Sequence, residues 1–178
     1  AELCKAGLAI RTRGGAQRMI TSSVIAYEDR RLNQTEAKAS IADTAAKLIP
    51  NGASLALNIG TTTEMVAEAL RLHKDLTVVS NNINMVPILR ASRLKSLFLI
   101  GGDVRLSDGA IIGSDAIKEI SNYKVDFAVI GASSLDADGS ILDFDQREVS
   151  VTRAILQNAR KTILVADVSK FELSAPFK

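Results

Sequence analysis

Cysteine, histidine and tryptophan are almost absent from this chain of 178 residues. It has one cysteine (Cys4), one histidine (His73) and no tryptophan. A single cysteine excludes an internal disulfide framework, and a single histidine excludes a metal site built from several histidines. A zinc site or a Ser-His-Asp triad would have to use these two residues, which stand in no recognisable motif. We therefore expect no metal and no cofactor.

Long apolar runs are absent as well. No run approaches the roughly 18 residues of a membrane span, and the start of the chain does not have the pattern of a signal peptide. We therefore expect a cytoplasmic protein without a membrane partner. Hydrophobic residues make up 47% and charged residues 24%, which is ordinary for a globular domain with a substantial core. The length fits one domain.

The net charge is small but unevenly placed. The whole chain has 22 basic and 20 acidic residues, a net charge of +2, which does not by itself indicate nucleic-acid binding. Residues 1–20 carry a local charge of +3, and the remainder carries −1. We therefore distinguish a basic N-terminal arm, residues 1–20, from a nearly neutral body, residues 21–178.

Short apolar runs alternate with amphipathic segments along the body. The apolar runs predict strands at residues 54–58, 76–79, 97–100, 125–130 and 162–166. Helical periodicity predicts helices at residues 35–49, 114–120 and 145–159, one after Gly60 that includes residues 65–70, and one through Ile83, Val86 and Leu89. Asp138-Gly139 indicates a tight turn. The pattern predicts an α/β domain with a mostly parallel sheet and helices on both faces.

Polar or glycine-rich residues follow each predicted strand. They are Asn58 with residues 60–63, residues 80–82, Gly101-Gly102, residues 131–133, and Asp167 with Ser169-Lys170. The carboxyl ends of parallel strands lie along one edge of a sheet, where ligands bind. We therefore expect all five strand ends to converge on one crevice.

The segment after the first predicted strand, Gly60-Thr61-Thr62-Thr63, has the clearest ligand-binding pattern. Glycine lets the backbone approach a ligand, and the threonines open a helix whose free N–H groups and dipole favour an anion. The segment is neither a Walker A loop nor a dinucleotide motif. A helix cap formed by Thr61 or Thr62 would explain the same pattern without a ligand.

Each of the other candidates has a structural alternative. Asn81 could orient sugar hydroxyls or cap a helix, and Gly101-Gly102 could form only a turn. Asp143 and Glu148 could bind hydroxyls, although acidic residues at a helix start are also favoured by the helix dipole. Lys170 could neutralise a phosphate or remain solvated. The residues alone leave these alternatives open.

A series of motifs follows in a fixed order along the chain. The motifs are residues 11–16 (RTRGGA), 36–38 with Ile41-Ala42, 58–63 (NIGTTT), 76–81, 100–102, Asp143-Phe144-Asp145 before Glu148, and 166–171 (ADVSKF). Their order and spacing resemble the C-terminal effector-sensing domain of DeoR-family bacterial transcriptional regulators over nearly the whole chain. The resemblance implies a fold similar to ribose-5-phosphate isomerase and CoA transferases.

The resemblance also implies a function. In this family the domain binds a phosphorylated sugar, sugar acid or polyol, and a preceding helix-turn-helix module binds operator DNA. The chain would be the sensor of a repressor of carbohydrate catabolism, and its basic arm would be the linker to that module. It would act as a homodimer or homotetramer, and the domain would continue beyond residue 178.

The resemblance assigns site residues too. The phosphate would be held by Gly60, Thr61, Thr62 and Thr63, and the rest of the pocket would be framed by Asn81, Gly101, Gly102, Gly131, Ala132, Asp143, Glu148 and Lys170. Asn58 belongs to the same set, but it stands where the family commonly has aspartate. The identity of the effector therefore cannot be carried over from the family.

A sugar-phosphate isomerase is the alternative function. Ribose-5-phosphate isomerase has an Asp-Gly-Ala-Asp-Glu run at the end of the corresponding strand, whereas here Gly131-Ala132 is flanked by Ile130 and Ser133. Isomerisation through an enediolate requires a positioned base, and isoleucine cannot act as one. We therefore predict binding without turnover and no catalytic residue.

Overall fold

The computed structural model describes residues 26–178, together with strands β1 (Ala9–Thr12) and β2 (Gly15–Arg18), which pair antiparallel. The predicted boundary between the basic arm and the body, after residue 20, lies outside the described residues.

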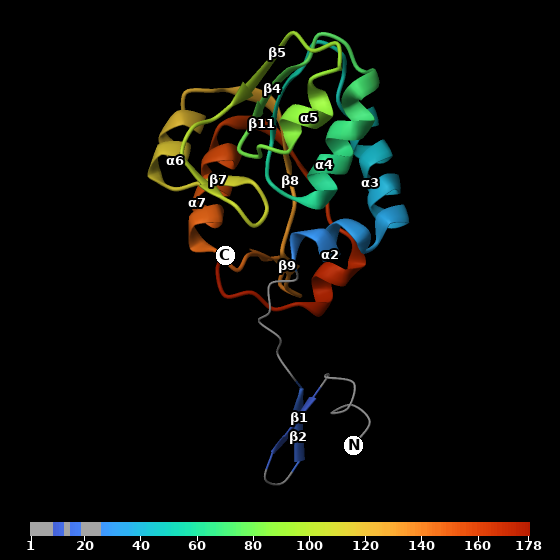
Figure 1. Cartoon of the computed structure of the whole chain (residues 1–178), viewed down its shortest axis with the longest axis vertical. Coiled ribbons are helices and arrows are strands. Elements are labelled where there is room, and N and C mark those ends of the chain that lie inside the picture. Colours follow the sequence, from blue (N-terminus) through green and yellow to red (C-terminus); the bar gives the residue numbers. More distant parts are fainter. Residues whose placement is uncertain (1–8, 13–14, 19–25) are drawn as a thin grey trace.

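A five-stranded parallel sheet forms the centre of the described body (Figure 1). Its strands are β3 (Ser54–Leu57), β4 (Thr77–Ser80), β5 (Ser96–Leu99), β8 (Val125–Ile130) and β11 (Ala159–Leu164), in the spatial order β11-β8-β3-β4-β5. All neighbouring pairs are parallel, so the predicted sheet and all five of its strands are confirmed. The last strand differs most, because it begins at Ala159 rather than at residue 162.

Helices cover both faces of the sheet, as predicted. Buried side chains of α3 (Thr35–Lys47), α4 (Thr61–Ala69) and α5 (Met85–Leu89) pack on one face, and those of α6 (Ser114–Ile120) and α7 (Gln146–Gln157) pack on the other. Two short 3-10 helices, η1 (Leu70–Leu72) and η2 (Val168–Glu172), follow α4 and β11.

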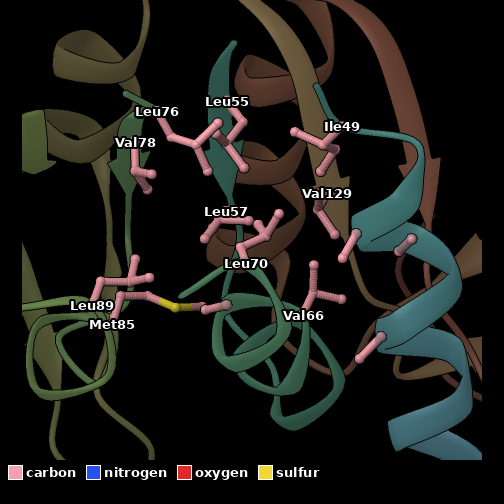
Figure 2. Close-up of a cluster of buried hydrophobic side chains, with 14 of the residues drawn as sticks. Ile49, Leu55, Leu57, Val66, Leu70, Leu76, Val78, Met85, Leu89 and Val129 are labelled. Atoms are coloured by element: carbon pink, nitrogen blue, oxygen red, sulfur yellow. The ribbon is translucent and has the colours of Figure 1, made fainter. Parts of the chain in front are cut away.

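The alternation of side chains along each strand divides the core into two layers. Leu55 and Leu57 of β3 join the cluster beneath α3, α4 and α5, whereas Ala56 between them joins the cluster beneath α6 and α7. Val129 of β8 belongs to the first layer, where it lies with Val66 and Leu70 (Figure 2). Successive side chains of a strand point to opposite faces, so these continuously apolar strands are buried on both sides.

Besides η2, one short helix and two hairpins of the described body were not predicted. They are the short helix α2 (Tyr27–Leu32), the antiparallel hairpin of β6 (Asp103–Arg105) and β7 (Ala110–Ile112), and the hairpin of β9 (Ser134–Leu135) and β10 (Ile141–Leu142). The second hairpin contains the predicted turn at Asp138-Gly139. Within the described residues, no helix combines the length and the apolar character needed to cross a bilayer.

Candidate functional site

The order of the strands determines where the crevice lies. The chain runs outward from β3 through β4 to β5 and then returns to the other side of β3, where it forms β8 and β11. The point where the strand order reverses, between β3 and β8, is where open α/β sheets bind their ligands. A crevice of about 390 Å³ lies at the carboxyl ends of these two strands, within the usual size range for a small-molecule site.

Most of the predicted site residues line this crevice. Those from the loops after β3 and β8, the start of α7 and η2 are Asn58, Gly60, Thr61, Thr62, Gly131, Ala132, Asp143, Glu148 and Lys170. Thr63 lies behind the lining: it is fully buried, and its hydroxyl donates to the carbonyls of Asn58 (2.8 Å) and Gly60 (2.7 Å). Thr63 therefore shapes the loop, while its neighbours face the crevice.

The ends of β4 and β5 do not reach the crevice. Both strands lie on the far side of β3, and the end of β4 is occupied by the β6–β7 hairpin, where the Ile111 N–H donates to the Asn81 carbonyl at 2.7 Å. Gly101 donates its N–H to a Glu119 carboxylate oxygen at 2.5 Å, and Gly102 packs against Ile111. The expectation that all five strand ends converge was therefore wrong for Asn81, Gly101 and Gly102, because it treated the strands as interchangeable.

The Gly60 loop leads into α4 without a capping side chain. Gly60 is the N-cap residue and has a φ of +138°, a conformation that favours glycine, and no side chain of the described residues caps the helix. Neither Thr61 nor Thr62 acts as the cap. The first N–H groups of a helix have no partner within it, so the backbone donors of this turn remain available at the crevice.

Asn58 and Asp143 are partly occupied by internal hydrogen bonds. The side-chain Nδ2 of Asn58 donates to Thr152 Oγ1 at 2.9 Å, and its side-chain Oδ1 accepts from the Ile59 N–H. Asp143 accepts from Ser133 Oγ at 2.7 Å and from the Asp145 N–H at 3.0 Å. These bonds hold the polar lining in a fixed orientation.

Glu148 is the most perturbed acid of the crevice. Burial, together with the nearby charge of Asp143, raises the pKa of its carboxyl from 4.5 to about 7. Arg105 opposes both effects, since its Nη2 lies 2.5 Å from Glu148 Oε2. Near neutral pH this carboxyl is therefore divided between its charged and neutral forms.

The sequence gives no signal for the role of Arg105, which holds the first turn of α7 against the β6–β7 hairpin. Its guanidinium contacts Asp108 Oδ2 at 2.7 Å and Asp145 Oδ2 at 3.0 Å, in addition to Glu148. Hydrogen bonds from Arg147 help lower the pKa of Asp145 to about 2. An arginine at the end of a three-residue strand has no periodicity or motif, so only the tertiary structure reveals this cluster.

Cationic groups lie on another part of the lining. Lys170 follows Asp167, whose carboxylate caps η2 through the Ser169 N–H at 2.9 Å. Burial lowers the pKa of the Lys170 ammonium, and the nearby charge of Arg30 lowers it further against the opposing effect of Asp167. Arg30 of α2 also lines the crevice, although no sequence motif marked it. A lining with cations, free backbone donors and carboxylates can bind an anionic group that carries hydroxyls.

The described residues contain no group of three or more histidine, cysteine or acidic side chains placed to hold a metal ion.

Solved structures with a similar fold include enzymes and non-enzymes. Ribose 5-phosphate isomerase A from Methanocaldococcus jannaschii matches with a TM-score of 0.56 and 16% identity over 78% of this chain and 55% of that one. The eIF2B-beta2-delta2 complex from C. thermophilum matches with a TM-score of 0.56 and 18% identity over 77% of this chain and 45% of the other. This chain spans about half the length of these proteins or less, and such identities show the fold alone.

Comparison with known sequences gives the family. The model of the DeoR C terminal sensor domain matches residues 33–178. The glycerol-3-phosphate regulon repressors of Escherichia coli and Haemophilus influenzae are 42% and 44% identical, over 98% and 97% of this chain and 69% and 68% of theirs. The HTH-type transcriptional repressor CsqR of Escherichia coli is 34% identical over 98% of this chain and 67% of its own length.

These relatives are named as repressors, which supports the prediction of binding without turnover. With a family model that covers most of its length and relatives matched over nearly all of it, the chain belongs to the DeoR family of transcriptional regulators, as a C-terminal sensor domain.

Proposed function

We propose that this domain binds a phosphorylated sugar, sugar acid or polyol in the crevice between β3 and β8. The phosphate lies at the Gly60 loop, against the backbone donors of Thr61 and Thr62, and Lys170 neutralises part of its charge. The hydroxyls of the effector face Asp143, Glu148 and the Gly131-Ala132 turn.

One observation carries this proposal: the uncapped start of α4 and a half-buried lysine, Lys170, line the same crevice. A helix N-terminus favours an anion, and a charge-assisted hydrogen bond to such an anion is worth on the order of 1.5–3 kcal/mol. Acidic residues elsewhere on the lining supply acceptors for hydroxyl groups. An effector with a phosphate at one end and hydroxyls at the other matches this distribution.

The names of the relatives support the same class of effector. Three of the matched proteins are glycerol-3-phosphate regulon repressors, which makes glycerol 3-phosphate the first compound to test. Other relatives carry different names, such as a putative aga operon transcriptional repressor at 30% identity. Different family members can therefore bind different effectors, according to the residues that line the crevice.

The proposal extends to the whole regulator. The name of CsqR contains "HTH-type", which supports a helix-turn-helix module that binds operator DNA in the full-length protein. We expect a homodimer or homotetramer in the cytoplasm, because a two-fold operator requires a two-fold protein. Effector binding changes operator affinity only if the regulator has two conformations that differ in their affinity for the effector.

A thermal-shift panel tests the proposal. The panel pairs phosphorylated compounds with their dephosphorylated counterparts: glycerol 3-phosphate with glycerol, hexose phosphates with hexoses, and sugar-acid phosphates with sugar acids. A ligand at 100 times its dissociation constant stabilises the folded state by about 2.7 kcal/mol. We expect a shift for at least one phosphorylated compound and none for its counterpart. Equal shifts within a pair, or no shift at all, would reject the phosphate site.

A variant of the Gly60 loop makes the test residue-specific. Thr62→Ala removes a hydroxyl at the crevice, and we expect it to weaken binding of the phosphorylated compound while the domain still folds. Thr44→Ala is the matched control, since Thr44 lies on the exposed side of α3 and its hydroxyl bonds only to the Ser40 carbonyl of its own helix. If both variants bind equally well, Thr62 is not part of the site.

A further inference from the structure

Helix α2 is held against the body by polar contacts. None of its residues is buried, and six residues are too few for a stable isolated helix. The Tyr27 hydroxyl donates to Glu64 Oε2 of α4 at 2.7 Å. The Lys38 ammonium donates to the carbonyls of Arg30 and Asn33 at the end of the helix. Figure 1 shows α2 near α4, with which it is in contact. The position of α2 therefore depends on a few hydrogen bonds beside the crevice.

Arg30 is the side chain of α2 that reaches the crevice. It lines this crevice and also a neighbouring cavity that contains Asp108 and Arg105. Its Nη2 lies 3.4 Å from Asp108 Oδ2, a long contact, whereas Arg105 approaches the same carboxylate oxygen at 2.7 Å. The Arg30 Nε is buried and has no hydrogen-bond partner among the described residues. The Arg30 guanidinium therefore has unused N–H donors, and its carboxylate partner, Asp108, is already bound more closely by Arg105.

Arg30 also lies close enough to Lys170 for the two positive charges to affect each other. The charge of Arg30 lowers the pKa of Lys170, which is the effect of a like charge nearby. Two cations that line the same crevice repel each other until an anion lies between them. A guanidinium can then bind a phosphate through two parallel N–H groups.

We infer that Arg30 is a ligand of the effector's anionic group, and that on binding its guanidinium exchanges Asp108 for that anion. The inference rests on the proposed function, since it takes a phosphorylated effector in the crevice as given. Because α2 buries no side chain, movement of Arg30 shifts the helix. Since α2 directly follows residues 1–26 in the chain, binding of the effector in the crevice changes the position of the segment that leads to the N-terminal side.

The test compares Arg30→Gln with Arg31→Gln. Arg31 is the next residue of the same helix, but its side chain is 55% exposed, pairs with Glu28 and does not line the crevice. Glycerol 3-phosphate and inorganic phosphate are titrated into each variant by calorimetry. We expect Arg30→Gln to weaken binding by about 10- to 100-fold, the value of a charge-assisted hydrogen bond. Arg31→Gln should change it by less than about twofold.

Hydrogen exchange at the amides of α2 tests whether effector binding shifts this helix. Saturating glycerol 3-phosphate should change the exchange of α2 in the wild type and in Arg31→Gln, but not in Arg30→Gln. Arg30→Lys, which keeps the charge but not the planar fork, should restore part of the affinity. Circular dichroism of each variant checks that the domain is folded.

The outcomes separate this inference from the proposed function. Equal affinities of Arg30→Gln and Arg31→Gln for glycerol 3-phosphate would overturn the inference and leave the phosphate site intact. If Arg30→Gln binds more weakly, but saturating glycerol 3-phosphate still changes the hydrogen exchange of its α2 as in the wild type, the transmission through this helix would be overturned. If the wild type binds neither glycerol 3-phosphate nor any other phosphorylated compound of the panel, the proposed function fails and the inference fails with it.

Discussion

Glu148 gives the domain a dependence of stability on pH that a single substitution should remove. Its carboxyl lines the crevice, and burial together with the charge of Asp143 raises its pKa from 4.5 to about 7. Between these two values the folded chain holds a proton that the unfolded chain has already lost. The stabilising contribution is therefore complete below about pH 4.5 and is lost as the pH rises through about 7.

The size of this effect follows from the shift. One pKa unit corresponds to about 1.4 kcal/mol, so the carboxyl accounts for at most about 3 kcal/mol between the two values. Asp145 has a pKa lowered to about 2, so its contribution changes only at pH values more acidic than this window. Glu148→Gln keeps the shape of the side chain and cannot ionise, and we expect its stability to fall much less with rising pH.

Urea unfolding at several values from about pH 5 to about pH 8 measures the difference between the two proteins as a function of pH. Glu28→Gln is the control, because Glu28 is an exposed residue of α2 that pairs with Arg31. The wild type should lose stability relative to Glu148→Gln by up to about 3 kcal/mol over this range, whereas Glu28→Gln should follow the wild type. Parallel curves for all three proteins would refute the assignment of a raised pKa to Glu148.

Two further predictions concern packing. Leu57→Ala removes a fully buried side chain of β3 and should lower the free energy of unfolding by about 2–5 kcal/mol in a urea titration; a loss well below this range would mean that the first core layer closes over the cavity. Gly109→Ala places a Cβ 2.7 Å from Ile83 Cγ1 at a φ of +78°, whereas Gly139→Ala has a φ of +84° but no atom within 4 Å. We expect Gly109→Ala to be the more destabilising by about 1–3 kcal/mol, and equal melting temperatures would contradict the close packing of the β6–β7 hairpin.

The sheet and its covering helices could be predicted because their apolar residues are regularly spaced. The run at residues 125–130 has apolar residues on both faces, and β8 packs against both core layers. Helix α7 was predicted from its apolar residues, and two of these, Ala154 and Ile155, are buried. In these segments local periodicity and tertiary packing favour the same structure.

Only some of the residues that line the crevice could be predicted from the sequence. The Gly60 loop and Gly131 were identified because each follows a strand, but Asn81 and Gly101 also follow strands and lie elsewhere. The difference depends on the spatial order of the strands, which apolar runs do not encode. Helix α2 and its Arg30 escaped notice for a related reason: α2 buries no side chain, so it has no apolar periodicity to detect.

Amide chemical-shift mapping can locate the phosphate of the effector, which we propose lies at the start of α4. The protein is titrated with the phosphorylated compound that gives the largest thermal shift and, separately, with its dephosphorylated counterpart. We expect the largest changes at Gly60, Thr61 and Thr62, and only with the phosphorylated compound. Unchanged amides at these residues, with the main changes around Asn81 and Gly101 instead, would contradict this placement of the phosphate.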